Sequence, residues 1–129
     1  MTDLLLDTSV AVPLLVASHV AHGAVSASVG DRSVALSGHA RHETYAVLTR
    51  LPADAVRLLR ERFEPAAILD TRSVRSAPAA VAGRGVVGGA TDDGLVALAA
   101  LSAGRPLASR DRRAQSTYRL VGVPVEVIG

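Results

Sequence analysis

The stretch Leu4-Leu5-Leu6-Asp7-Thr8-Ser9 sets the interpretation of the whole sequence. Three apolar residues run into an acid and two hydroxyl residues, which is typical of a short buried strand that ends at a polar turn. Open α/β sheets bind ligands at the carboxyl ends of their strands, where Asp7 is expected to lie. An Asp-Thr-Ser segment can also cap a helix, so the stretch alone leaves both interpretations open.

Strands and helices are predicted to alternate along the rest of the chain. Strands are predicted at 34–37, 67–69, 106–109 and 123–128, and helices at 9–17, 19–29, 40–51, 53–63, 73–87, 93–103 and 112–118. This alternation predicts an α/β fold, with a mostly parallel sheet of four to five strands that is covered by helices on both faces.

The composition bounds the class of protein. A chain of 129 residues with 49% hydrophobic and 20% charged residues is expected to fold as a single domain over 1–129. Only 2% of the residues are aromatic, so the core must consist of Ala, Val and Leu. The absence of cysteine excludes a disulfide scaffold and thiolate metal sites. The net charge of +2 permits an anionic partner without requiring one.

The N-terminal sequence and the longest apolar stretch predict neither a signal peptide nor a membrane span. No basic segment precedes an apolar run at the N-terminus, and the longest apolar stretch, 10–29, is interrupted by Pro13, His19 and His22. We therefore expect no signal peptide, no membrane span and a cytoplasmic location.

Acids follow two of the predicted strands. Asp7 follows the first strand, and Asp111 follows the strand at 106–109. The carboxyl ends of parallel strands meet at one edge of the sheet, so these two acids are expected to lie near each other. The alternative for Asp111 is a helix cap flanked by solvated arginines.

Three further acids lie on predicted helices. Glu43 falls on the apolar stripe of its helix, which is formed by Ala40, Thr44, Val47, Leu48 and Leu51. An unpaired carboxylate there would be destabilising, so Glu43 must be protonated, paired with an arginine or bound to a metal. Asp92 and Asp93 open the helix at 93–103, where one of them is expected as the cap. The apolar pattern does not decide which of the two points inward.

Carboxylates crowded at one sheet edge would repel one another, which raises some of their pKa values. A hard divalent cation removes this repulsion, and ligation by oxygen atoms alone suits Mg²⁺ or Mn²⁺. If a phosphodiester supplies further oxygens, the expected chemistry is metal-assisted in-line hydrolysis without a covalent enzyme intermediate.

Four segments in this order resemble the PIN-domain nucleases of the VapC toxin type. They are Leu-Leu-Leu-Asp-Thr-Ser-Val at 4–10, His-Glu-Thr-Tyr-Ala-Val-Leu-Thr-Arg-Leu at 42–51, Asp-Gly-Leu-Val-Ala-Leu-Ala-Ala at 93–100 and Leu-Ala-Ser-Arg-Asp-Arg-Arg at 107–113. No single segment is specific, but the set covers the whole chain. The resemblance implies a three-layer α/β/α sandwich with a central parallel sheet.

The resemblance also implies a function and a set of site residues. Its four acids fall on Asp7, Glu43, Asp93 and Asp111, and its hydroxyl partners fall on Thr8 or Ser9 and on Ser109. Similar proteins are ribonucleases that use Mg²⁺ or Mn²⁺, usually form homodimers and are held inactive by a small cognate antitoxin. The implied function is therefore that of the toxin in a toxin–antitoxin pair.

The sequence departs from this family pattern in three places. Position 109 is Ser where Thr is commoner, which keeps the hydroxyl group. The residue before the third acid is usually apolar or aromatic but is Asp92 here, and Asp93 is favoured as the third acid because the segment after it matches in register. Residues 65–90 match weakly, so no contact to substrate or antitoxin is assigned there.

RNA contact cannot rest on stacked aromatic residues, because the chain contains only three. Arginines that meet backbone phosphates are the expected contacts, with Arg110, Arg112 and Arg113 as candidates because they flank Asp111. The alternative is a solvated basic cluster.

Other functions are less well supported. Residues 83–88 fit G-x-G-x-x-G by letter, but no strand precedes them, so no nucleotide cofactor is expected. The remaining alternative is a catalytically silent PIN-like module that binds RNA or protein. Apolar helical residues could line a groove for a partner helix or belong to the core, namely Val12, Leu14, Leu15, Val56, Leu59 and Phe63.

Overall fold

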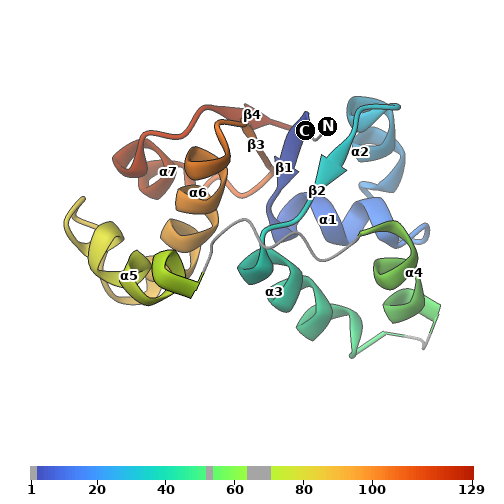
Figure 1. The fold of residues 1–129 in the computed structure, drawn as a ribbon. Helices are drawn as coiled ribbons and strands as arrows, with labels where there is room; N and C mark the ends of the chain where they lie inside the picture. The colour runs from blue at the N-terminus through green and yellow to red at the C-terminus, as the bar shows by residue number, and fades with distance from the viewer. Residues whose placement is uncertain (1–2, 52–53, 64–70) are drawn as a thin grey trace.

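The first strand, β1 (Leu4–Leu6), lies inside a parallel sheet (Figure 1). The computed structural model of the chain describes residues 3–51, 54–63 and 71–129. Within these residues the sheet has four strands in the order β2-β1-β3-β4, the others being β2 (Val34–Ala35), β3 (Leu107–Ser109) and β4 (Val125–Val127). The predicted parallel sheet is confirmed. The strand predicted at 67–69 lies outside the described residues.

The pairing of β1 explains its uniformly apolar sequence. Leu5 lies opposite Ala35 of β2 and Leu107 of β3, so β1 has a parallel neighbour on each side. Its three leucines are at most 1% exposed. A strand covered on both faces needs a continuous apolar run rather than an alternating one, which is the pattern at 4–6.

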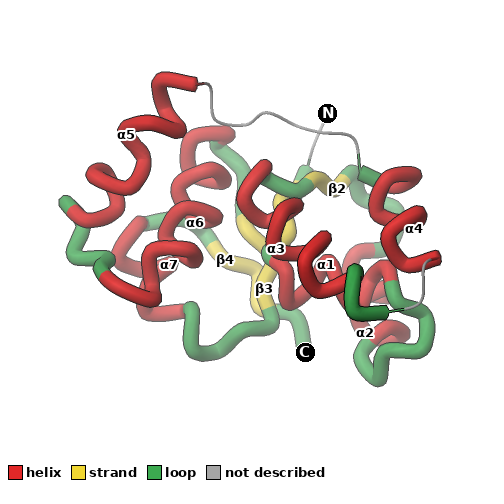
Figure 2. The backbone as a smooth tube through the Cα atoms, turned by 90° about the horizontal axis from the view of Figure 1, so that it is seen from below, coloured by secondary structure: helices red, strands yellow, loops and turns green. Residues whose placement is uncertain are grey.

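Helices lie on both sides of the sheet (Figure 2). One set comprises α1 (Thr8–Leu15), α2 (His22–Val29), α3 (Gly38–Leu48) and α4 (Asp54–Arg62). The other comprises α5 (Thr71–Ala82), α6 (Thr91–Ala103), which a 3₁₀ turn at Gly88–Ala90 precedes, and α7 (Gln115–Val121). Helix α1 packs against α2, α3 and α4, whereas α6 packs against α5 and α7. The three-layer α/β/α arrangement is confirmed.

Several predicted helix bounds are wrong. The helix predicted at 112–118 is α7 at Gln115–Val121, and the helix predicted at 73–87 is α5 at Thr71–Ala82. Two further starts differ for a local reason. The helix expected from His19 begins at His22, because the His19 ring accepts a hydrogen bond from the Ala21 amide at 3.0 Å and turns the chain. The helix expected from Asp93 begins at Thr91, with Ala90 in the N-cap position and no side-chain cap. The expectation that Asp92 or Asp93 caps this helix is therefore wrong.

The apolar stripe of α3 is narrower than predicted. The Ser37 hydroxyl caps the helix by accepting a hydrogen bond from the Ala40 amide at 3.1 Å, and the helix ends at Leu48 instead of residue 51. Ala40, Thr44 and Leu48 are buried, whereas Val47 and Leu51 are 39% and 37% exposed. The predicted stripe was therefore too broad at its C-terminal end. In the described ranges, no helix is long and apolar enough to cross a membrane.

Close packing between α5 and α6 gives a test of the fold at Gly94. A Cβ atom at Gly94 would lie 2.9 Å from Val86 Cγ1 and 3.3 Å from Val81 Cβ, both in the core. Gly94→Ala is expected to lower the free energy of unfolding by about 1–3 kcal/mol, as overpacking does. Urea denaturation of the two proteins measures this difference.

Gly23→Ala is the matched control, because Gly23 lies in α2 with nothing within 4 Å of its added Cβ. It should raise the free energy of unfolding by roughly 0.4–1 kcal/mol. A Gly94→Ala variant as stable as the Gly23→Ala variant would contradict the packing of α6 described here.

Candidate functional site

Asp7 is buried at the end of β1, with 4% of its surface exposed. Its backbone occupies the N-cap position of α1, but its side chain makes no capping hydrogen bond. Instead, Oδ1 accepts a hydrogen bond from the Ser9 hydroxyl, and Oδ2 accepts one from the Tyr118 hydroxyl at 2.8 Å. Of the two interpretations of Asp7, a side-chain helix cap is excluded.

Hydrogen bonds join the end of β3 to the end of β1. The Asp7 amide donates to the Ala108 carbonyl at 3.0 Å, and the Arg110 amide donates to the Ser9 hydroxyl at 2.8 Å. Within the chain that leaves β3, the Asp111 amide donates to the buried Ser109 hydroxyl at 3.1 Å. Because β1 and β3 are neighbours, Asp7 and Asp111 follow adjacent strands at one edge of the sheet. Asp111 accepts a hydrogen bond from the Arg113 amide at 2.9 Å, so it also closes the turn that leads to α7.

Glu43 lies on α3 beside His39. Its side chain is 35% exposed, and His39 Nε2 lies 4.0 Å from Glu43 Oε1. Burial raises the pKa of the Glu43 carboxyl, the nearby His39 lowers it, and the charges of Asp92, Asp93 and Asp7 raise it. No arginine forms an ion pair with Glu43 in the part of the chain that the structure describes, so the predicted alternative of a buried Glu–Arg pair is absent there.

Asp92 and Asp93 lie in the first turn of α6 but have different surroundings. Asp92 is 65% exposed and accepts a 3.0 Å contact from His39 Nε2. Asp93 is partly buried, and its pKa is raised by burial first and then by the charges of Asp111, Asp7 and Asp92. The two acids therefore differ in their surroundings. Asp92 pairs with His39, whereas Asp93 lies near enough to Asp7 and Asp111 for their charges to raise its pKa.

The electrostatics and the donor types fit a hard divalent cation. The polar side chains near the carboxyl ends of β1 and β3 are carboxylates and hydroxyls, and oxygen donors of this kind suit Mg²⁺ or Mn²⁺. Across residues 3–51, 54–63 and 71–129, no three acidic or histidine side chains already enclose a point within coordinating reach. This is compatible with Mg²⁺, which usually keeps several waters and uses one or two carboxylates.

Two polar contacts at this edge were missed by the sequence analysis. Tyr118 of α7 was counted only as an aromatic residue, although a buried tyrosine hydroxyl needs a partner and here uses Asp7. Burial and the Asp7 charge raise the pKa of the Tyr118 phenol far above its usual 10.0, which keeps the hydroxyl protonated. His39 was given no role in the sequence analysis, yet its position one helical turn before Glu43 could have revealed it.

The remaining predicted residues are placed as follows. Thr8 Oγ1 is buried and has no hydrogen-bond partner in the described residues, whereas the neighbouring Ser9 contacts Asp7. Arg112 and Arg113 are exposed, the Arg113 side chain by 97%. The Arg110 guanidinium lies against Gly129, where an added Cβ would be 3.4 Å from Arg110 Nε. The Arg110 guanidinium therefore has Gly129 as a close neighbour.

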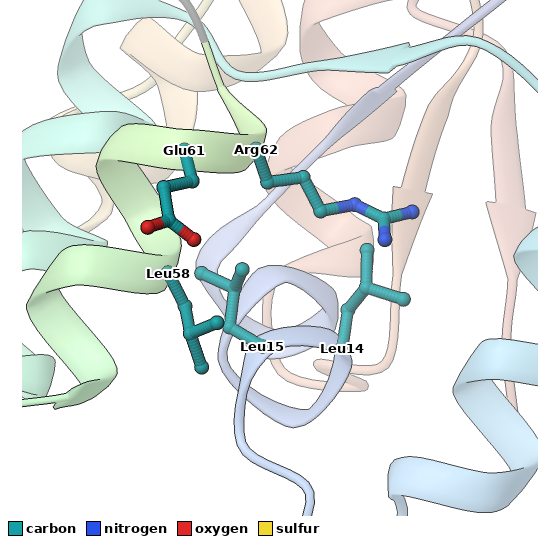
Figure 3. A pocket seen from close by; sticks show the side chains of 5 residues that line it. All are labelled: Leu14, Leu15, Leu58, Glu61 and Arg62. Atoms are coloured by element: carbon teal, nitrogen blue, oxygen red, sulfur yellow. The ribbon is translucent and has the colours of Figure 1, made fainter.

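A separate cavity of about 300 Å³ lies between α1 and α4 (Figure 3). Leu14 and Leu15 of α1 and Leu58, Glu61 and Arg62 of α4 line it. None of the predicted metal-binding acids lines it. Leu59 and Phe63, which the sequence analysis considered for a groove, are at most 2% exposed and belong to the core.

A family model, described as the PIN domain, matches residues 4–120. The chain belongs to the PIN-domain family. This confirms the resemblance predicted from the four sequence segments, and proteins of this family are generally dependent on divalent metal ions.

One relative and two solved structures extend this comparison. The chain is 50% identical to ribonuclease VapC27 of Mycobacterium tuberculosis, with 96% of each chain covered. Its fold is similar to a crystal structure of VapBC2 from Rickettsia felis bound to promoter DNA, with TM-score 0.70, 13% identity and coverage of 99% and 100%. It is also similar to VapC20 of M. tuberculosis, a toxin that cleaves the sarcin–ricin loop, with TM-score 0.68, 18% identity and coverage of 88% and 94%.

Burial of Asp93 beside other acids predicts that the stability of the protein depends on pH, and the Asp93→Asn variant should reveal this dependence. The folded pKa of Asp93 is raised above its usual 3.8, so above that pH the folded protein binds more protons than the unfolded chain. Stability from this group is complete below about pH 3.8 and is lost as pH rises through the folded pKa. Asp93→Asn should therefore raise the Tm of the metal-free protein at pH 7 and lose this advantage in acid.

Asp31→Asn is the control, because Asp31 is exposed in the turn before β2. Calorimetric melting in a chelating buffer from pH 3 to pH 8 measures both variants against the parent chain. A Tm at pH 7 that is lower for Asp93→Asn than for the parent would show that Asp93 is not repelled by its neighbours.

Proposed function

We propose that this chain is a divalent-metal-dependent ribonuclease of the VapC type, which hydrolyses RNA phosphodiester bonds with one PIN-like domain spanning 1–129. The observation that supports the proposal is that Asp7 and Asp111 follow the adjacent strands β1 and β3, and that Asp93 is near enough to both, and Glu43 to Asp7 and Asp93, for their charges to interact. We call these four acids at the carboxyl ends of β1 and β3 the acidic edge. The pKa values of Glu43 and Asp93 are raised first by burial and then by the charges of the neighbouring acids, which a bound cation would offset. The 50% identity to a ribonuclease supports the same activity.

The four acids are assigned to Mg²⁺ or Mn²⁺ as direct ligands or through water. When bound, the metal supplies a more acidic water and offsets negative charge on the scissile phosphate. Asp93 is favoured over Asp92 as the third acid, because Asp92 is exposed and pairs with His39. Ser9 and Ser109 support the site through Asp7 and Asp111, and Thr8 stays a candidate to contact water or substrate.

RNA backbone phosphates are assigned to Arg112 and Arg113. Both side chains are exposed, and Arg113 Nε lies 3.9 Å from Asp111 Oδ1. Both therefore lie where the backbone of an RNA strand that crosses the acidic edge would pass. Arg110, the third arginine predicted for this role, is a weaker candidate because its guanidinium packs on the C-terminal residue.

The proposed biological role is that of the toxin in a toxin–antitoxin pair, acting in the cytoplasm as a homodimer. Similarity to VapC27 and to the VapBC2 complex supports a VapC-type role with a small antitoxin as partner. Three leucines line the cavity between α1 and α4, together with Glu61 and Arg62. The leucines suit an apolar side chain of such a partner.

Asp7→Asn should abolish cleavage, because it removes the charge of the buried strand-end acid while preserving its shape. We expect a loss of about 100-fold or more, since even outer partners of metal ligands are worth 10–100-fold. The assay incubates purified protein with total bacterial RNA and Mg²⁺ or Mn²⁺ and identifies the new RNA ends by sequencing. Circular dichroism verifies that the variant is folded.

Asp92→Asn and Asp93→Asn form a matched pair in the same assay. Asp93→Asn should behave like Asp7→Asn, and Asp92→Asn should retain most of the cleavage. Full activity in Asp7→Asn would refute the proposed site. A folded parent chain that neither cleaves RNA nor binds Mn²⁺ in calorimetry would favour the catalytically silent binding module.

A further inference from the structure

Tyr118 is a buried side chain that contacts Asp7 at the end of β1, although the two residues are far apart in the sequence. It is 1% exposed, lies on α7 and donates its hydroxyl to Asp7 Oδ2 at 2.8 Å across 111 residues of sequence. A buried tyrosine hydroxyl needs an acceptor, and a backbone carbonyl would serve a purely structural role equally well. Here the acceptor is the buried carboxylate at the end of the central strand.

The second feature is how the two Asp7 oxygens divide their donors. The Ser9 hydroxyl donates to Oδ1, and Tyr118 donates to Oδ2, so each oxygen has one fixed neighbour. The terminal torsion of an aspartate is broad, so an unrestrained carboxylate rotates over a wide range. Two donors on different oxygens hold the plane of the group. Each oxygen keeps a second lone pair for another contact.

The third feature is that both donors are themselves held. Ser9 accepts a hydrogen bond from the Arg110 amide at 2.8 Å, which ties it to the chain that leaves β3. Tyr118 lies on α7 and is held by the hydrophobic core, of which it is a member. The two donors to the Asp7 carboxylate are therefore held in place by the chain segment that follows β3 and by α7. Both segments are far from Asp7 in the sequence.

We propose that Tyr118 is a positioning residue of the nuclease site, which fixes the Asp7 carboxylate in the orientation that metal binding and cleavage require. This inference rests on the proposed function of Asp7 and adds a residue that the four-acid pattern does not contain. Donors that orient a metal ligand typically contribute 10–100-fold to affinity or activity.

Tyr118→Phe tests the inference, because it removes the hydroxyl and keeps the ring. We expect kcat for RNA cleavage to fall by roughly 10–100-fold with little change in KM, and the Kd for Mn²⁺ from calorimetry to rise within the same range. A merely structural tyrosine would lower Tm and leave both quantities unchanged well below Tm. Tyr45→Phe is the control, because Tyr45 is 43% exposed on α3, and it should match the parent chain.

A second measurement avoids the risk that Tyr118→Phe does not fold. The chain has two tyrosines, so in a Tyr45→Phe background fluorotyrosine labelling places one fluorine probe, at Tyr118. Its ¹⁹F resonance should move when Mg²⁺ is added and should differ in an Asp7→Asn variant. A resonance that responds to neither change would overturn the inference.

The outcomes separate the two proposals. If Asp7→Asn is inactive while folded Tyr118→Phe cleaves RNA and binds Mn²⁺ like the parent, the positioning role is wrong and the proposed nuclease site stands. If Asp7→Asn itself cleaves RNA normally, the proposed function of this site fails, whatever Tyr118→Phe does.

Discussion

The parallel pairing of β1 with β3 is the constraint on which the acidic edge depends. Leu5 pairs with Leu107 and Leu6 with Ala108, so the chain segments that leave both strands start side by side. Asp7 follows one of these strands and Asp111 follows the other. Strands in the same direction put both acids at one edge, whereas an antiparallel pair would have sent them to opposite edges.

The surrounding structure holds this edge together against electrostatic repulsion. Glu43 and Asp93 have raised pKa values because they are partly buried near other carboxylates. Neutral donors offset part of this cost, since Ser9 and Tyr118 hydrogen-bond to Asp7 and the Arg113 amide bonds to Asp111. Clusters of acids with perturbed pKa values are typical of functional sites rather than of groups that stabilise the fold.

The sequence was informative where one physical rule dominated. The apolar run before Asp7 and the alternation of strands and helices were enough to predict the parallel α/β sheet with Asp7 and Asp111 at one edge, whereas the adjacency of β1 and β3 comes from the structure. The positions of Asp7 and Asp111 followed from that topology. Local side-chain contacts were not predictable in this way, so the helix predicted from His19 starts three residues later, where ring hydrogen bonds replace helical ones.

The parts of the site that depend on tertiary contacts could not be derived from spacing. The apolar pattern left Asp92 and Asp93 open because both lie in one helical turn, and the family register alone favoured Asp93. In the structure the approach of His39 to Asp92 and the partial burial of Asp93 distinguish them. Tyr118 lies seven residues after Asp111 on a different element, and no periodic pattern connects it to Asp7. The roles assigned to these residues stay predictions until they are tested by substitution.

The central claim is that one divalent cation site lies at the carboxyl edge of the sheet. The most direct test is a ¹H–¹⁵N NMR spectrum of the metal-free protein with substoichiometric Mn²⁺, which broadens amide signals near the bound ion. The account predicts the strongest broadening at Ser9, Gly94 and Arg110, which adjoin the acids, and little at Asp54 and Glu61 of α4. Broadening centred on α4, or spread evenly over exposed acids, would contradict it.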